Sequence, residues 1–256
     1  MNPIVLAIVN QKGGVGKTTS AINIATFLSE SGLKTLLIDL DPQANATSGV
    51  GIKTGEIQAS VYDFMVSDHL RTDVLYPTPF ENLHLMPSSQ DLAGAEIELV
   101  SVVSREWVLK KRLDVIKSAY DFIIMDCPPS LGLLTVNALV AADKAIIPVQ
   151  CEYFALEGLA RLVQTVSLVK GSYNPQLEVG GIVLTMYDSR TALNKQVAQN
   201  AKSYFSELVF DTIIPRNIRL TEAPSHGLPI ALYSPLSKGS QAYLDLTKEL
   251  IQRVAA

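Results

Sequence analysis

The sequence predicts an α/β fold: a doubly wound, mostly parallel sheet with helices on both faces. Its short apolar segments are continuous instead of alternating, as is typical of strands that are covered on both sides. Helical patterns separate these segments, and a glycine-rich loop joins the first segment to the first helix. The expected strands are IVLAIVN (4–10), TLLIDLD (35–41), DFIIMD (121–126), KAIIPVQ (144–150), EVGGIVLTMYD (178–188) and VFDTIIP (209–215).

The first expected helix follows the glycine loop. Ala21, Ile24, Ala25 and Leu28 recur with the spacing of one helix face, and Gly32 stands where a C-terminal cap belongs. Further helical patterns cover residues 95–119, 131–142, 155–170, 193–206 and 239–254. Alternation of these helices with the apolar segments predicts the doubly wound layout.

Composition places the chain among globular proteins. We expect one domain, residues 1–256, because 48% of the residues are hydrophobic, 18% are charged and no low-complexity linker interrupts the chain.

Cys127 and Cys151 show no metal-ligand spacing, so we expect reduced thiols in the core of a cytoplasmic protein. A net charge of −4 and a pI near 5.4 give no overall attraction to DNA or to anionic membranes. Any such binding needs a local basic patch.

The glycine-rich loop carries the strongest chemical signal. It lies between an apolar strand and an amphipathic helix, which is the context of a phosphate-binding loop. Its glycines let backbone amides turn toward phosphates, and the helix N-terminus adds partial positive charge. Lys17 would pair with the β- and γ-phosphates and the Thr18 hydroxyl would ligate Mg²⁺. The expected nucleotide contacts in the loop are Lys12, Gly13, Gly14, Val15, Gly16, Lys17, Thr18 and Thr19.

The residue before the paired glycines is Lys12, so the loop reads KGGVGKTT and departs from the general G-x-x-x-x-G-K-[ST] pattern. In this form the chain resembles the deviant Walker A group of P-loop NTPases, and within that group the ParA/Soj chromosome-partitioning ATPases. The resemblance implies that Lys12 is the signature lysine, which reaches across an ATP-dependent homodimer to the partner's phosphates. Such an ammonium would stabilise charge on the transferred phosphoryl group, as an arginine finger does. A solvated surface lysine is the alternative.

Three aspartates end expected strands near this loop. Asp39 and Asp41 lie in DLDPQ, and Asp126 ends the next apolar segment before Pro-Pro. The resemblance implies that Asp41 positions the attacking water, that Asp126 is the Walker B residue that holds Mg²⁺ through a water, and that Asp39 lies near the metal. Lys12, Lys17 and Asp41 are therefore the candidate catalytic residues. The alternative for the first pair is a turn-capping role before a proline.

The C-terminal half resembles the same family in IPRNIRLTEAPSHG. The resemblance implies an adenine pocket at Pro215 and Asn217, and non-specific binding of double-stranded DNA by the ATP dimer through Arg190 and Arg219. Residues 186–220 hold five basic against three acidic residues, so the local excess is small. A solvated helix face is the alternative interpretation.

The implied function is ATP-dependent chromosome or plasmid partitioning by a weak ATPase, with hydrolysis stimulated by a ParB/Spo0J-type centromere-binding protein that releases DNA. We expect a cytoplasmic, nucleoid-associated protein without membrane binding or an N-terminal helix-turn-helix domain, because the phosphate loop begins by residue 11. The alternative is a MinD-like membrane-associated ATPase. That class needs a basic amphipathic C-terminal helix, whereas this chain ends in LTKELIQRVAA, without a bulky aromatic residue.

Overall fold

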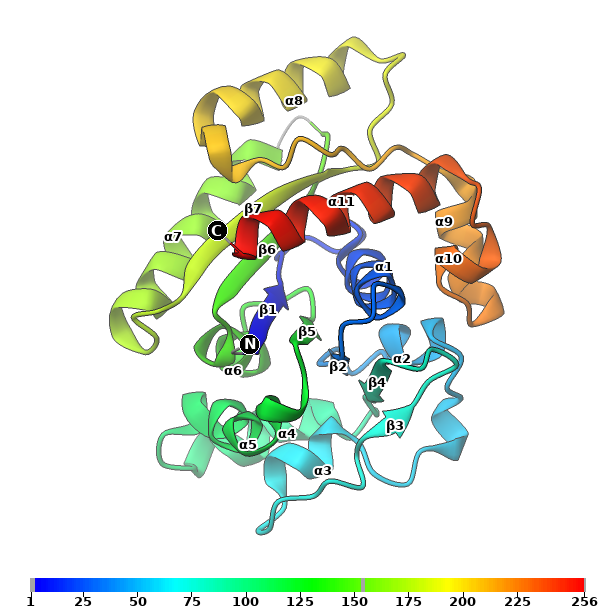
Figure 1. The fold of residues 1–256 in the computed structure, drawn as a ribbon. Helices are drawn as coiled ribbons and strands as arrows, with labels where there is room; N and C mark the ends of the chain where they lie inside the picture. Colours follow the sequence, from blue (N-terminus) through cyan, green and yellow to red (C-terminus); the bar gives the residue numbers. More distant parts are fainter. Residues whose placement is uncertain (1–2, 153–154, 256) are drawn as a thin grey trace.

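The computed structural model describes residues 3–152 and 155–255, and in this part of the chain seven strands form one sheet (Figure 1). The strand order is β3-β4-β2-β5-β1-β6-β7. Neighbouring strands pair in parallel, except that β3 runs antiparallel to β4. The predicted doubly wound, mostly parallel sheet is confirmed. The strands are β1 (Ile4–Ile8), β2 (Thr35–Asp39), β3 (Tyr76–Pro77), β4 (Leu83–Met86), β5 (Phe122–Asp126), β6 (Lys144–Gln150) and β7 (Glu178–Thr185).

Helices cover both faces of this sheet. One core lies between the sheet and the face that carries α1 and α11, and the other lies beneath α3 to α8. The helices are α1 (Lys17–Glu30), α2 (Asn45–Gly49), α3 (Val61–Val66), α4 (Leu92–Glu98), α5 (Val108–Ile116), α6 (Leu133–Ala141), α7 (Ala155–Ser172), α8 (Ala192–Phe205), α9 (Ile218–Glu222), α10 (Ile230–Tyr233) and α11 (Lys238–Ala255). Because both faces are covered, strands β1, β2 and β5 are buried almost along their whole length.

The carboxyl ends of three central strands meet at one point. In register, Ile8 of β1 lies beside Asp126 of β5, and Asp126 lies beside Asp39 of β2. The glycine loop leaves β1 directly after this point. Ligands of open α/β sheets bind at this edge, so the topology itself brings the loop and the strand-end acids together.

The segment 209–215 is not a strand, contrary to the prediction. Isolated bridges join Val209 to Ile182 of β7 and Pro215 to Tyr187 just beyond it. Phe210 N–H donates to Ile182 O, and Ile214 N–H donates to Leu184 O. Between these points the amides of Asp211 and Thr212 donate to the Glu249 carboxylate of α11, at 2.8 and 2.9 Å. The Glu249 side chain therefore accepts from backbone amides that would otherwise be available for pairing with a neighbouring strand.

The predicted helix over residues 95–119 is interrupted. It consists of α4, the 3-10 turns η2 (Leu99–Ser101) and η3 (Arg105–Trp107), α5 and the turn η4 (Lys117–Ala119). The break falls where Val102 is extended and Ser104 adopts a left-handed conformation with φ of 59°. β-Branched residues at 100, 102 and 103 weaken the helix there. Trp107 packs against the core.

Residues 52–95, for which the sequence predicted no function, supply the edge of the sheet. Strands β3 and β4 extend it beyond β2, and α3 covers it, after the short turn η1 (Thr54–Glu56). The only sequence signal for β4 is the alternation of buried Leu83 and Leu85 around exposed His84.

Cys127 and Cys151 are buried free thiols, as predicted. Among the described residues, no helix is both long and apolar enough to cross a membrane.

Candidate nucleotide-binding site

The glycine loop has the backbone shape of a phosphate cradle. Gly14 and Gly16 adopt positive φ angles of 74° and 90°, which side-chain-bearing residues rarely tolerate. Gly16 is the N-cap of α1, and Lys17 is its first residue. The first amides of a helix have no partner inside the helix, so they point toward the space that the loop encloses.

Two neighbouring strands hold the loop in place. The Thr185 hydroxyl, at the end of β7, donates to the Val15 carbonyl at 2.8 Å. The Asn10 side chain donates to the Pro148 carbonyl of β6 at 2.7 Å, and it accepts from the Lys12 amide at 2.9 Å. The loop is therefore tied to β6 and β7, and Thr185 is a site residue that the sequence analysis did not single out.

Lys17 lies inside the cradle and is buried. Its ammonium donates to the Lys12 carbonyl at 3.1 Å, which closes the loop across its own base. Burial lowers the pKa of Lys17, whereas the nearby charges of Asp126 and Asp41 raise it. Partial desolvation strengthens the attraction of this ammonium for an anionic ligand, whereas the neighbouring acids reduce it.

Lys12 points in a different direction. Its ammonium forms an ion pair with the carboxylate of Glu152, two residues past β6, and the two side chains are 54% and 46% exposed. Lys12 is therefore outside the cradle in this monomer, where a second molecule can reach it. Exposed ion pairs contribute less than ~1 kcal/mol, so Lys12 can change partners at low cost.

The strand-end acids differ sharply in their surroundings. Asp126 is completely buried, and neither carboxylate oxygen has a hydrogen-bond partner within the described residues. Burial and the neighbouring Asp39 raise the pKa of Asp126 well above its usual value, although the nearby Thr18 hydroxyl and Lys17 ammonium act in the opposite direction. Asp39 is equally buried but accepts three hydrogen bonds from Thr47 and Asp41, and burial still raises the pKa of Asp39 to about 6.

Asp41 begins the turn after β2 and lines the pocket. Its side chain accepts from the Gln43 amide at 2.9 Å, and it is 8% exposed. Its own amide donates to Asp39. The structure thus brings Asp41, Asp126 and the loop lysines to the same edge, as the sequence predicted.

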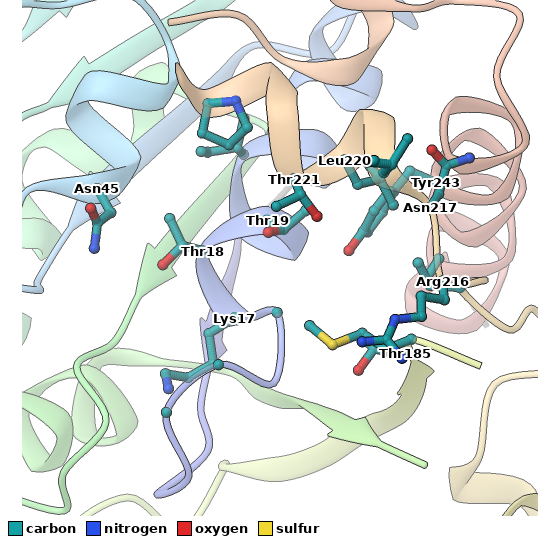
Figure 2. Close-up of a pocket in the computed structure, with 18 of the residues that line it drawn as sticks. Lys17, Thr18, Thr19, Asn45, Thr185, Arg216, Asn217, Leu220, Thr221 and Tyr243 are labelled. Atoms are coloured by element: carbon teal, nitrogen blue, oxygen red, sulfur yellow. The ribbon is translucent and has the colours of Figure 1, made fainter. Parts of the chain in front are cut away.

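A cleft of about 860 Å³ extends from the cradle toward α9. Figure 2 shows Lys17 at one end and Asn217, Leu220, Thr221 and Tyr243 gathered at the other. Pro215 also lines the cleft. Asn217 lines the cleft, and its side-chain oxygen caps α9 by accepting from the Arg219 amide at 2.8 Å. Sequence reasoning missed the lining residues Met186, Arg216, Thr221 and Tyr243.

The two predicted DNA contacts lie outside the cleft lining. Arg190 is 86% exposed and forms a two-bond pair with Asp188, at 2.9 and 2.7 Å, which holds the pKa of Asp188 far below its usual value. Arg219 pairs with Glu222 at 2.9 Å. Both guanidinium groups are thus matched with carboxylates on an exposed surface, where such pairs exchange readily.

A glycine cradle before a helix, a buried lysine at that helix start and a carboxylate on the adjoining strand define a P-loop nucleotide-binding protein. The chain matches the family described as AAA domain over residues 4–179. It is 54% identical to the sporulation initiation inhibitor protein Soj of Bacillus subtilis, over 96% of this chain and 97% of that protein. It is 51% identical to the chromosome partitioning protein ParA of Myxococcus xanthus, over 97% and 88%. The chain therefore belongs to the Soj/ParA family of chromosome-partitioning P-loop ATPases.

Solved structures agree with this fold. Cobyrinic acid a,c-diamide synthase from Mycobacterium smegmatis, solved with a bound ATP analog and magnesium, is 36% identical and superimposes with a TM-score of 0.86, over 99% of this chain and 96% of that one. The cell division ATPase MinD of Pyrococcus furiosus has a TM-score of 0.82 at 24% identity, over 98% and 99%, which is a likeness of fold.

Proposed function

We propose that this chain is a partitioning ATPase whose single domain, residues 1–256, binds ATP with Mg²⁺ and closes into a homodimer that binds DNA. The observation that carries the proposal is the difference in location between the two lysines of the loop. Lys17 is buried in the cradle, whereas Lys12 is exposed beside it in a weak ion pair. Lys17 is placed to bind the nucleotide of its own chain, whereas Lys12 could contact a nucleotide that a second copy of the chain binds.

The residues of the site fit a metal-bound nucleotide. Thr18 lines the cleft, and the unpartnered carboxylate of Asp126 is buried at the end of β5 beside the end of β1; these two groups would hold Mg²⁺ and its waters. Among the described residues, no group of three or more His, Cys, Asp or Glu side chains could hold a metal. Such a sparse set suits Mg²⁺, which usually takes one or two carboxylates and fills its shell with phosphates and water. The ion would neutralise charge on the phosphates.

The phosphates would lie on the amides of residues 13–19, with the Lys17 ammonium beside them. Asp41 would then orient the water that attacks the terminal phosphate, because its carboxylate lines the same cleft and is held by the Gln43 amide. The base would lie at the far end, against Pro215 and the Asn217 amide group. Hydrolysis with one positioned water and no dedicated strong base accords with weak intrinsic activity.

Dimerisation would require Lys12 to leave Glu152 and reach the phosphates bound by the partner. The exposed pair is worth less than ~1 kcal/mol, whereas an ammonium desolvated against phosphate oxygens gains more. ATP and the second copy would therefore stabilise each other. This coupling makes the dimer a sensor of bound ATP.

The ATP dimer would bind double-stranded DNA without sequence preference through Arg190 and Arg219, each released from its carboxylate partner. Two-fold symmetry doubles a modest basic surface, so DNA binding would depend on the dimer and fall steeply with salt. A ParB/Spo0J-type partner would then stimulate hydrolysis and release the DNA. The protein would be cytoplasmic and associated with the nucleoid while ATP is bound.

The membrane-associated alternative fits the last helix less well. The apolar side chains of α11, including Tyr243, Leu246 and Leu250, are buried in the core beside α1. Arg253 donates to two backbone carbonyls and to Glu249 instead of facing outward. A helix that has already buried its apolar face has little left for a bilayer surface, so we propose that no membrane is bound.

The test is DNA binding by fluorescence anisotropy, with a labelled duplex of arbitrary sequence and with ATP, ADP or no nucleotide. The proposal expects binding with ATP alone, weakening as salt is raised. A ParB/Spo0J-type protein should accelerate hydrolysis. Equal DNA affinity in ADP and ATP, or sedimentation with anionic liposomes in place of DNA binding, would overturn it.

A further inference from the structure

Thr47, on the short helix α2, is completely buried and makes an unusually full set of bonds. Its amide and its hydroxyl both donate to Asp39 Oδ2, at 2.8 and 2.7 Å. The same hydroxyl accepts from the Ser88 amide, just after β4, at 3.0 Å. One side chain therefore joins the end of β2 to the end of β4.

The other oxygen of Asp39 is also occupied. Its Oδ1 accepts from the Asp41 amide at 3.1 Å, so the carboxylate has three donors from the protein. Asp126, its neighbour across the ladder, has none within the described residues. Of the two buried acids, one is satisfied by the protein and the other is left for a cation.

We propose that Asp39 is a positioning residue, that Thr47 anchors it, and that Asp39 does not ligate Mg²⁺. This assignment replaces the expectation that Asp39 belongs to the metal site. It rests on the proposed role of Asp41 in hydrolysis, because the function of the Asp39–Thr47 pair is to hold the Asp41 backbone.

The geometry of the turn shows why such an anchor is needed. The chain reverses between Asp41 and Asn45, with the Ala44 amide donating to the Asp41 carbonyl at 2.9 Å and Ala44 itself at a positive φ of 54°. A non-glycine residue in that conformation is strained and persists only where its surroundings fix it. The bonds of Thr47 to Asp39 and Ser88 supply that restraint from both sides.

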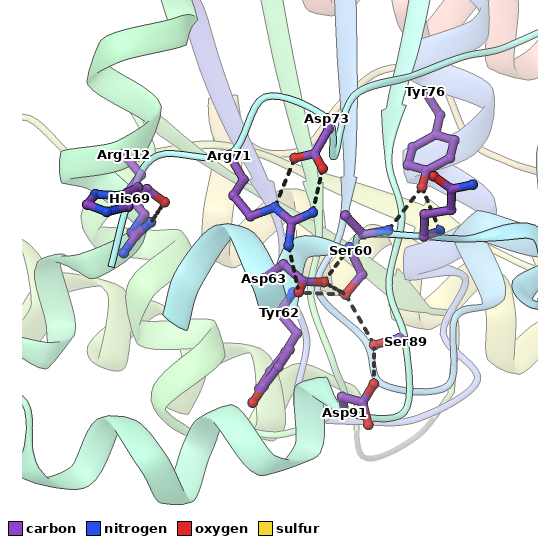
Figure 3. A network of polar contacts seen from close by, with 12 residues as sticks. Ser60, Tyr62, Asp63, His69, Arg71, Asp73, Tyr76, Ser89, Asp91 and Arg112 are labelled. Atoms are coloured by element: carbon purple, nitrogen blue, oxygen red, sulfur yellow. Dashed lines mark hydrogen bonds and ion pairs between the residues drawn. The ribbon is translucent and has the colours of Figure 1, made fainter. Parts of the chain in front are cut away.

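The anchor continues into residues 52–95. Figure 3 shows Ser89, the residue after Ser88, joined to Ser60, which caps α3 together with Asp63. Asp63 in turn pairs with Arg71. The turn that carries the water-positioning carboxylate is thus tied to the sheet edge for which the sequence predicted no function.

The first experiment compares Asp39→Asn with Asp126→Asn in the full chain. Binding of a fluorescent, non-hydrolysable ATP analogue is titrated with Mg²⁺, and hydrolysis of ATP is measured separately. An asparagine at 39 has one acceptor oxygen, so it cannot keep all three bonds. We expect its half-saturating Mg²⁺ to stay within about two-fold of wild type while kcat falls about 10–100-fold. Asp126→Asn should raise the half-saturating Mg²⁺ about ten-fold or more.

The second experiment compares Thr47→Val with Thr47→Ser, which keeps the hydroxyl. For Thr47→Val we expect a lower kcat with the KM for ATP within about three-fold, as for a residue that acts through another. Hydrogen exchange in the nucleotide-free protein should be faster at Ser88 and at residues 39–47. Thr47→Ser should restore both properties, which a general packing defect would not do.

An Mg²⁺ requirement that rises as much in Asp39→Asn as in Asp126→Asn would overturn the proposal, and so would unchanged kcat and exchange in Thr47→Val. Failure of the proposed function is distinguishable. It would show as undiminished hydrolysis in Asp41→Ala, whereas the Mg²⁺ titration and the exchange measurement report on Asp39 and Thr47 without hydrolysis.

Discussion

Replacing Asp126 by asparagine should stabilise the nucleotide-free protein while it weakens the nucleotide complex. Asp126 is fully buried, its carboxylate oxygens lack partners among the described residues, and Asp39 lies beside it in register. Burial and Asp39 both raise the pKa of Asp126, which means that its charge destabilises the empty fold. Asn has nearly the same shape and no charge.

The expected gain comes from removing the buried charge, and each pKa unit of elevation that is removed corresponds to about 1.4 kcal/mol in the free energy of unfolding. For a chain of this size one such unit corresponds to a rise in Tm of about 3–6 °C. Wild type gains about 2.7 kcal/mol from a ligand present at 100 times its Kd, and the variant should lose most of this gain for Mg²⁺ with an ATP analogue.

The pH dependence gives the prediction its sign. A carboxyl group whose pKa is raised in the folded state contributes stability that is present below its unfolded pKa and lost as pH rises through the folded pKa. For Asp39 this loss occurs between the ordinary value of 3.8 and about 6. The pKa of Asp126 is raised as well, so its contribution has the same sign. The advantage of Asp126→Asn should therefore grow as pH rises above the ordinary carboxyl value of about 4.

Differential scanning calorimetry with and without Mg²⁺ and the analogue measures all of these quantities. Thr35→Ser, a buried change on the same strand as Asp39 but away from the cleft, serves as a control for general effects on the sheet. A lower Tm for the nucleotide-free Asp126→Asn protein at neutral pH would refute the claim that this acid is left uncompensated.

Three further predictions concern the loop and the surface. Glu152→Gln should let the ATP dimer form at up to about five-fold lower protein concentration, because it removes the carboxylate that pairs with Lys12 in the single chain. A dilution series followed by light scattering would contradict this if the variant required more protein to dimerise. Thr185→Val should raise the Kd for an ATP analogue about two- to ten-fold because it removes the hydrogen bond to the Val15 carbonyl, while Thr185→Ser should not. Equal titration curves for Thr185→Val and wild type would argue against a role of this hydrogen bond in nucleotide binding. Asp188→Asn should strengthen DNA binding because it frees Arg190. Arg190→Ala should weaken DNA binding and lower the slope of log affinity against log salt concentration by about one. Anisotropy curves in which both variants match wild type would exclude a role of Arg190 in DNA binding.

The parts of the fold that the sequence predicted are those with a local cause. β6 coincides with its predicted segment, and α1 follows a loop whose glycines and lysine leave little choice. The segment 209–215 failed because its partner for hydrogen bonding is Glu249, nearly forty residues away, which no local pattern shows. β4 was missed because four residues carry too little periodicity.

The same distinction holds for the site. The loop, Asp41 and Asp126 could be predicted from sequence motifs and from the family resemblance, because each lies at or just after the end of a strand. Thr185 ends β7 and Glu152 lies two residues past β6, and the order of the strands in the sheet brings both to the loop. The contrast between Asp39 and Asp126 depends on hydrogen bonds from Thr47. Such information exists only in three dimensions.

Light scattering coupled to size exclusion measures whether Lys12 makes the dimer depend on ATP. The protein would carry Asp41→Ala to retain bound ATP, with and without Lys12→Ala. We expect a dimer with ATP, a monomer with ADP, and a monomer in both nucleotides once Lys12 is replaced. A dimer that persists with ATP after Lys12→Ala would contradict this expectation.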